Sequence, residues 1–266
     1  MRALTFGFSP CPNDTFAFHA LVHGLVDAPF RVEPVLLDID ELNVRARSGE
    51  LDLTKLSFGA FPAIGDAYRL LRSGAALGRG VGPLVVAREA MTLDQAARGR
   101  IAIPGRDTTA FLMLRLASPR LGGVVELRYD RILEAVAGGE VGAGLIIHES
   151  RFTYADHGLA PVADLGEWWE GETGLPVPLA GICARADLDD ETVAAAEAAI
   201  RASVEHAFRF PQASREYVRA NSQELSDEVC AAHIALYVNE FSADLGDEGL
   251  AAIDRLVGCA AAISAA

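Results

Sequence analysis

The segment GPLVVAR (residues 82–88) is an apolar run that ends in Ala-Arg, and PLAGICAR (178–185) repeats this pattern later in the chain. Both are interpreted as hinge strands, and the block of about 90 residues between them has strand-like and helix-like segments of its own. A chain that leaves one lobe, builds a second and returns has this organisation. The pattern predicts a discontinuous first lobe (1–88 and 182–266), a second lobe (89–181) and a substrate cleft between them; one continuous sheet without a cleft is the alternative.

The rest of the chain alternates strand-like and helix-like segments, which is typical of an α/β protein with a mainly parallel sheet. Within this alternation, residues 58–71 are predicted to be helical and residues 154–176 to be irregular. From Asp189 onward the apolar residues recur at helical spacing. The C-terminal part is therefore predicted to be helical.

Composition limits the class of partner. The chain has 266 residues, of which 51% are hydrophobic, so a sizeable core is available and disorder is not expected. Asp and Glu (37) outnumber Lys and Arg (23), and the formal net charge of -14 argues against a nucleic-acid partner, because phosphate binding needs a basic surface. A small anionic ligand stays possible, since a few local cations or a helix N-terminus suffice to bind it.

The cysteines and the apolar runs of the sequence indicate the cellular compartment of the protein. None of the four cysteines forms a C-x-x-C pair, and no Cys/His cluster has zinc spacing, so no metal site and a reducing compartment are expected. The N-terminal MRALTFGFSP lacks the apolar core of a signal peptide, and apolar runs fall far short of the roughly 20 residues of a membrane helix. These features predict a cytoplasmic protein without membrane insertion, whose oligomeric state stays unknown.

The loop SPCPNDT (9–15) directly follows the first predicted strand, where ligands bind in open α/β sheets. Its prolines restrict the backbone, and the polar residues after them can cap the following helix. The loop is either a tight turn or a wall of the ligand cleft made of Pro12, Asn13, Asp14 and Thr15. Cys11 is interpreted as a packing residue, because no clear activating base or cation adjoins it in sequence.

Two further loops combine polar groups with strand ends. Lys55 and Ser57 lie two residues apart and therefore face the same side of a strand, where they suit one ligand or are merely a solvated lysine and a capping serine. In PGRDTTAF (104–111), Asp107, Thr108 or Thr109 caps a helix. The backbone N–H groups near Thr109 and Ala110 then form either a plain helix start or an anion site.

His148 directly follows an apolar strand-like run in GLIIHES and is the candidate general base. A histidine that is hydrogen-bonded within the structure is the alternative. His19 and His23 have metal-capable i, i+4 spacing, but no third ligand is evident. Two other histidines belong to apolar helical patterns, and one lies in the irregular segment: His206, His233 and His157.

Several segments of the sequence resemble those of the 1,4-dihydroxy-6-naphthoate synthase family of the futalosine branch of menaquinone biosynthesis. They are GFSPCPNDTFAFHALVHG, LTKLSFGA, LGRGVGPLVVAR, PGRDTTAFL, RYDRILEAV and GLIIHESRFTY. The resemblance continues through LPVPLAGICARADL and extends into the helical tail with ELSDEV and YVNEFS. It implies a two-lobed fold similar to type II periplasmic binding proteins, with two hinge strands and a helical C-terminal part.

The resemblance also implies an activity. Members of this family are lyases that convert cyclic dehypoxanthine futalosine into 1,4-dihydroxy-6-naphthoate and dihydroxyacetone, with neither a metal nor an organic cofactor. The proton acceptor of the family corresponds to His148. Its substrate contacts correspond to Lys55, Leu56, Ser57, Thr109 and Ala110.

Two other functions are compatible with the same fold. One is a solute-binding protein that captures a small acid without converting it, since a fold does not determine a function. The missing export signal and the placement of His148 argue against it. The other is the related chorismate dehydratase of the same pathway, which the opening loop and IIHESRFTY fit less well.

Overall fold

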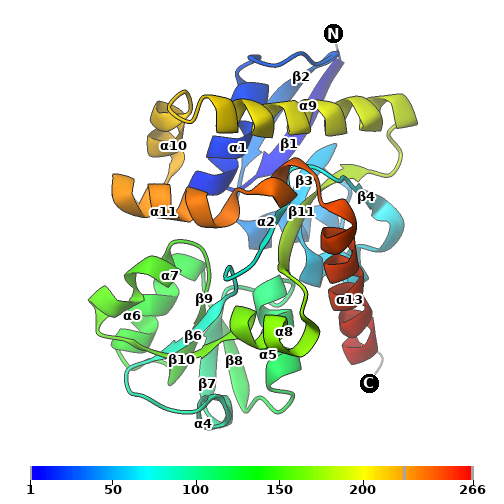
Figure 1. Ribbon diagram of the computed structural model, residues 1–266. Coiled ribbons are helices and arrows are strands. Elements are labelled where there is room, and N and C mark those ends of the chain that lie inside the picture. Colours follow the sequence, from blue (N-terminus) through cyan, green and yellow to red (C-terminus); the bar gives the residue numbers. More distant parts are fainter. Residues whose placement is uncertain (1, 224–225, 265–266) are drawn as a thin grey trace.

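The structure, a computed structural model, describes residues 2–223 and 226–264 and contains two β-sheets with flanking helices (Figure 1). The first sheet lies in the upper half of Figure 1 and the second in the lower half. Helix α13 (Gly246–Ser264) runs along one side of the molecule past the boundary between them. This arrangement of two sheets and a helical C-terminal part confirms the predicted fold class.

The first sheet has the strand order β2-β1-β3-β11-β4, and β5 also pairs with β11. β1 pairs with β2 and β3 in parallel, whereas β11 is antiparallel to its neighbours, so the sheet is mixed rather than purely parallel. The strands are β1 (Arg2–Phe8), β2 (Phe30–Leu36), β3 (Leu53–Ser57), β4 (Tyr68–Leu70), β5 (Ala76–Gly78) and β11 (Val177–Arg185).

The second sheet has the order β10-β6-β9-β7-β8 and is also mixed. β7 is parallel to β8 and β9, and β6 is antiparallel to β9 and β10. The strands are β6 (Leu84–Ala87), β7 (Arg100–Ile103), β8 (Gly123–Glu126), β9 (Ala143–Ile146) and β10 (Ala160–Asp164).

The structure changes the positions at which the chain passes between the sheets. The predicted boundary at residue 88 put β6 in the first lobe, but β6 pairs with β9 and β10 of the second sheet. The predicted boundary at residue 182 divides β11, which pairs only with strands of the first sheet. An apolar run indicates that a strand is buried but not which sheet it joins. We therefore propose lobe boundaries in the connections β5–β6 and α8–β11.

Two secondary-structure predictions were wrong in part. Residues 58–71 contain only short helical turns before β4, because Gly65 has a φ of 58° and ends α3 (Phe61–Ile64). Residues 154–176 contain β10 and α8 (Leu165–Thr173) in addition to irregular structure. Asp164 caps α8 by accepting hydrogen bonds from the backbone N–H groups of its first turn.

The remaining helices cover the two sheets and form most of the chain after β11 (Figure 1). Ser203 of α9 fastens this helix to α1, since its hydroxyl donates to the carbonyl of Ala17 over 2.7 Å. The helices are α1 (Pro12–Val22), α2 (Ile39–Ala46), α4 (Leu93–Arg98), α5 (Thr109–Ala117), α6 (Ile132–Ala137), α7 (Ser150–Thr153), α9 (Asp190–Arg209), α10 (Arg215–Asn221), α11 (Asp227–Tyr237) and α12 (Glu240–Ala243).

One hydrophobic cluster joins both lobes. It includes Phe58 and Leu77 from the first sheet region, Val85 and Ile101 from the second sheet, and Leu256 from α13. All five side chains are buried. The two lobes are therefore packed against each other over an apolar core as well as connected by the crossing segments.

The start of α5 is held directly against the first sheet. The hydroxyl of Thr109 donates to the carbonyl of Leu179 in β11 over 2.6 Å and accepts from the backbone N–H of Gly59 over 3.1 Å. A Cβ atom at Gly59 would lie 2.7 Å from the carbonyl oxygen of Thr108, so only glycine allows this close approach. These contacts fix the N-terminus of α5 at the boundary between the lobes.

Candidate functional site

A cavity of about 610 Å³, open solvent at its mouth included, lies between the lobes. Both sheets contribute to it through residues at or just beyond the ends of their strands, and α11 closes part of its wall. The lining residues are Ser9, Asn13, Ile39, Lys55, Ser57, Ala76, Val81, Pro83, Thr108, Thr109, Ala110, Ile147, His148, Leu179, Ala180, His233 and Tyr237. The structure thus brings together six of the predicted site residues, which are Asn13, Lys55, Ser57, Thr109, Ala110 and His148.

Four predicted residues do not line this cavity. The side chain of Leu56 is fully buried in a hydrophobic cluster with Ile64 and Tyr68 on the other face of β3. The other three, Pro12, Asp14 and Thr15, belong to the first turn of α1. The prediction that Asn13, Asp14 or Thr15 caps this helix was wrong, because the helix begins at Pro12 and the N-cap position is Cys11.

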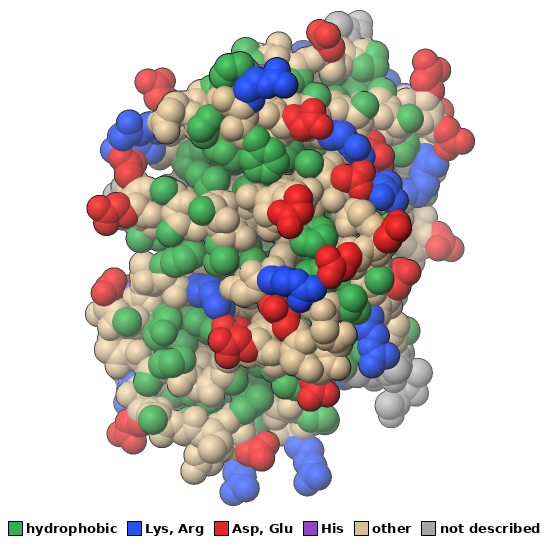
Figure 2. Space-filling model, in the orientation of Figure 1, with side chains coloured by type: hydrophobic (Ala, Val, Ile, Leu, Met, Phe, Trp, Pro, Cys, Tyr) green, Lys and Arg blue, Asp and Glu red, His purple; other side chains and the backbone are tan. Residues whose placement is uncertain are grey.

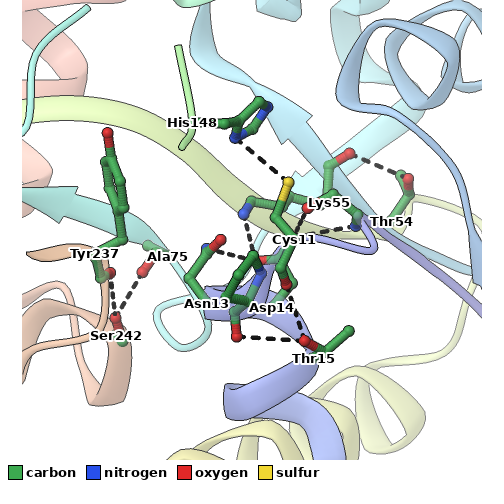
Figure 3. Close-up of polar contacts among 12 residues, drawn as sticks. Cys11, Asn13, Asp14, Thr15, Thr54, Lys55, Ala75, His148, Tyr237 and Ser242 are labelled. Carbon is green, nitrogen blue, oxygen red and sulfur yellow. Dashed lines mark hydrogen bonds and ion pairs between the residues drawn. The ribbon is translucent and has the colours of Figure 1, made fainter. Parts of the chain in front are cut away.

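A buried charge pair supports the loop after β1 (Figure 3). The ammonium of Lys55 is paired with Oδ1 of Asp14, and both side chains are almost fully buried. Oδ2 of Asp14 accepts from the hydroxyl of Ser9 over 2.6 Å and from the backbone N–H of Ser9 over 3.1 Å, and Oδ1 accepts from Asn13 over 2.8 Å. The positive charge of Lys55 is therefore already balanced by Asp14 within the protein, although Lys55 lies in the cavity wall.

The hydroxyl of Ser57 is oriented by a buried amide that the sequence analysis missed. Nδ2 of Asn43 donates to the Ser57 hydroxyl over 3.0 Å, and Oδ1 of Asn43 accepts from the Ser57 backbone N–H over 2.9 Å. Because the hydroxyl oxygen is an acceptor in this bond, its own proton is available to a group in the cavity. Asn43 is hard to find in the sequence, since one polar residue in a short amphipathic helix is usually exposed.

Helix α5 presents its N-terminus to the same cavity. The Thr108 side chain accepts from the Phe111 backbone N–H over 3.2 Å, which confirms that this segment caps the helix. Thr109 and Ala110 occupy the first two helical positions, whose N–H groups have no intrahelical partner. Together with the helix dipole, these donors suit a carboxylate or another anionic oxygen.

His148 stands just beyond β9 in a strained backbone conformation. Its φ is 55°, a value that non-glycine residues rarely adopt. Its ring packs edge-on against Tyr129, with 4.9 Å between the ring centroids. Burial, followed by the positive charge of Lys55, lowers the pKa of His148 to about 4, although Asp14 opposes this shift. The imidazole is therefore neutral at pH 7, the protonation state that a proton acceptor needs.

Cys11 contacts this imidazole, with 3.5 Å between its Sγ and Nδ1 of His148 (Figure 3). Burial, followed by the negative charge of Glu149, raises the pKa of the Cys11 thiol well above its usual value. A protonated, buried thiol is a poor nucleophile, which agrees with the interpretation of Cys11 as a packing residue. In the tautomer that carries its proton on Nδ1, the His148 ring donates to this sulfur and keeps the lone pair on Nε2.

Two aromatic residues of α11 complete the wall and were not predicted as site residues. His233 is completely buried, and Tyr237 packs on it with 4.6 Å between the ring centroids. Both recur in the apolar pattern of a helix, so the sequence favoured a core role for them. The available signal was the polarity of His233 within that apolar pattern, which the sequence alone does not separate from a hydrogen-bonded core histidine.

Two further properties of the described ranges, 2–223 and 226–264, concern metal ions and membranes. No group of three or more His, Cys, Asp or Glu side chains within them could hold a metal ion. The helices of these ranges include none that is long and apolar enough to cross a bilayer. On the face shown in Figure 2, acidic and basic side chains are interspersed.

Comparison with known proteins gives consistent results. Residues 4–262 match a family model that is described as menaquinone biosynthesis. The chain is 57% identical over 258 residues to a 1,4-dihydroxy-6-naphthoate synthase of Thermus thermophilus, and the alignment covers 96% of this chain and 93% of the relative. It is 47% identical over 265 residues to the enzyme of the same name from Streptomyces coelicolor, with coverage of 97% and 93%.

Solved structures show which fold the chain shares. A protein from Archaeoglobus fulgidus superposes with a TM-score of 0.93 at 38% identity, covering 99% of this chain and 98% of the other. The alkanesulfonate-binding protein SsuA from Xanthomonas axonopodis pv. citri has a TM-score of 0.68 at 17% identity, with coverage of 89% and 84%, which shows the periplasmic-binding-protein-like fold alone. The chain belongs to the menaquinone biosynthesis family, among the enzymes related to 1,4-dihydroxy-6-naphthoate synthase.

Proposed function

We propose that this chain converts cyclic dehypoxanthine futalosine into 1,4-dihydroxy-6-naphthoate and dihydroxyacetone, with His148 as the proton acceptor. The observation that carries the proposal is a neutral, buried imidazole on the wall of a cavity that also holds an anion-binding helix N-terminus. Both curated relatives described above are named for the naphthoate product. A pure solute-binding protein would not need a base at this place.

The residues divide the work as follows. The N–H groups of Thr109 and Ala110 hold the carboxylate of the aromatic acid, and the Ser57 hydroxyl donates to an oxygen of the substrate. His148 removes a proton, and departure of the sugar-derived carbons lets the second ring become aromatic. Lys55 contributes as a hydrogen-bond donor in the wall, because Asp14 already balances its charge.

We expect the walls of the cavity to shield the intermediate from bulk water, and the shared apolar core limits how far the lobes can separate. Catalysis then depends on positioning and on one well-placed base rather than on a reactive nucleophile. This agrees with the raised pKa of the Cys11 thiol.

The test is to incubate the purified protein with cyclic dehypoxanthine futalosine and to follow the naphthoate chromophore. His148→Asn is the informative variant, since asparagine tolerates a positive φ and keeps the loop folded. We expect kcat to fall by about 10²–10⁴-fold while the substrate still binds. Binding without conversion by the unmodified protein would favour a solute-binding role, and near-normal turnover by His148→Asn would remove His148 from the mechanism.

A further inference from the structure

His233 of α11 is a buried polar side chain without a hydrogen-bond partner. Its exposed fraction is 0%, and neither Nδ1 nor Nε2 bonds to any group among the described residues. A neutral imidazole carries one N–H donor and one lone pair, and a buried polar group that is left unbonded destabilises the folded protein. Since most buried polar groups in proteins are bonded, this pair of unbonded nitrogens needs an explanation.

The surroundings of the ring do not supply one. Its aromatic neighbours are Tyr237 at 4.6 Å, Phe152 at 6.3 Å and His148 at 6.4 Å between ring centroids. An apolar side chain would satisfy the packing against such neighbours without an unbonded donor and acceptor. His233 also lines the cavity described above, so its ring lies at the edge of the space that a bound molecule would fill.

The ring lies opposite the candidate base. Helix α11 packs on α1 and β5 of the first lobe, whereas His148 and Phe152 follow β9 of the second lobe. In Figure 1, α11 lies directly above α7, the helix that carries Phe152. The two imidazoles therefore lie on either side of the boundary between the lobes, and the 6.4 Å between their ring centroids allows one substrate group to lie near both.

We propose that His233 is a substrate-binding residue that hydrogen-bonds a hydroxyl or carbonyl oxygen of the sugar-derived part of the substrate, next to the group that His148 deprotonates. This rests on the proposed function. A hydroxyl can accept from the N–H of a neutral imidazole or donate to its lone pair, so it can bond either ring nitrogen. The carboxylate has its own site at the N-terminus of α5, so the sugar-derived part is the portion left to face α11.

The ionisation state of His233 is consistent with this role. Burial is the main cause that lowers the pKa of His233 well below its usual value. His148 in its protonated form and the positive charge of Lys55 act in the same direction. Phe152 and Tyr237, the other rings packed on it, bring no positive charge at pH 7. The ring therefore offers one donor and one acceptor. An imidazolium would offer two donors instead, and these would suit an anionic oxygen better.

The experiment compares His233→Leu, His233→Gln and Cys230→Ala in the full chain. Cys230 is buried on the same helix, three residues before His233, and its hydrophobic cluster is not the one that contains Tyr237. Cys230→Ala therefore reports any general disturbance of α11. We expect His233→Leu to lower kcat/KM for cyclic dehypoxanthine futalosine about tenfold or more, mainly through KM, and His233→Gln to restore part of the loss. The kcat/KM of Cys230→Ala should stay near that of the unmodified enzyme.

A second readout separates a ligand role from a structural one. Removing an unbonded buried donor and acceptor should leave the Tm of the free His233→Leu enzyme unchanged or raised. An unchanged kcat/KM, or a large drop in Tm, would overturn the assignment of His233 alone. An unmodified protein that neither binds nor converts the substrate would instead overturn the proposed function, and this assignment with it.

Discussion

The loop after β1 and the loop after β9 meet where Cys11 contacts His148, and they differ in how their polar groups are bonded. In the first loop, Asp14 is paired with Lys55 and accepts from Ser9 as well. In the second loop, His148 has a strained φ, and its Nδ1 contacts a weakly polar thiol.

This difference separates residues that hold the site from residues that act in it. A charge that is paired and hydrogen-bonded within the protein has little capacity left for a ligand, and its removal affects folding first. An imidazole that is neutral, buried and weakly bonded keeps its hydrogen-bonding capacity for the substrate. We therefore expect the first loop to govern stability and the second loop to govern turnover.

The largest effect should come from breaking the charge pair. Asp14→Asn leaves the buried ammonium of Lys55 without its counter-charge, and we expect the free energy of unfolding to fall by about 3–5 kcal/mol. Urea denaturation measures this change. His148→Asn serves as the comparison from the other loop, and its unfolding free energy should stay near that of the unmodified protein.

The double variant Asp14→Asn/Lys55→Met sharpens the same result. Removing both charges takes away the unpaired ammonium, so most of the stability lost in Asp14→Asn should return. If the single variant is as stable as the unmodified protein, or if His148→Asn is the less stable of the two, the division between the loops is wrong.

Sequence reasoning found parts of both loops, for different reasons. His148 was identified because it directly follows an apolar strand, a local pattern that places its side chain at a strand end. The pairing of Asp14 with Lys55 joins residues that are 41 positions apart, and no local pattern indicates it. Asp14 was instead interpreted, together with Asn13 and Thr15, as a candidate helix cap and as part of a possible cleft wall.

The same limit explains the errors in the fold. The apolar run of β6 predicted a buried strand correctly, but the choice between two sheets depends on contacts with β9, far along the chain. His233 lies in a helix whose apolar spacing was predicted correctly, yet only the folded structure shows that its ring nitrogens have no hydrogen-bond partner among the described residues. Local elements follow from local residues, whereas the site depends on contacts between lobes.

An effect of intermediate size should appear when the pH is lowered from 6.5 to 5. The unfolded state protonates its histidines near pH 6.5, but His148 in the folded state stays neutral down to about pH 4. The unfolded state therefore binds more protons in this window, and the free energy of unfolding falls by up to about 1.4 kcal/mol per pH unit for each such histidine.

Thermal or urea unfolding of the unmodified protein and His148→Asn at pH 6.5, 6.0, 5.5 and 5.0 measures this slope. The window lies above the usual pKa of aspartate and glutamate, so paired carboxylates contribute little to it. His148→Asn should show the smaller slope. Equal slopes would mean that His148 is protonated in the folded protein and is not the neutral base assumed here.

The smallest effect concerns the contact between the two loops. If Cys11 orients the Nδ1–H of His148, then Cys11→Ala should lower kcat about threefold to tenfold, the equivalent of one ordinary hydrogen bond, with KM unchanged. Cys11→Ser keeps an acceptor at this place and should restore most of the rate. A nucleophilic Cys11 predicts instead that both variants lose all turnover. A residue that only packs predicts a lower Tm in Cys11→Ala with an unaltered kcat, so the rates and Tm values of the two variants together decide among the three roles.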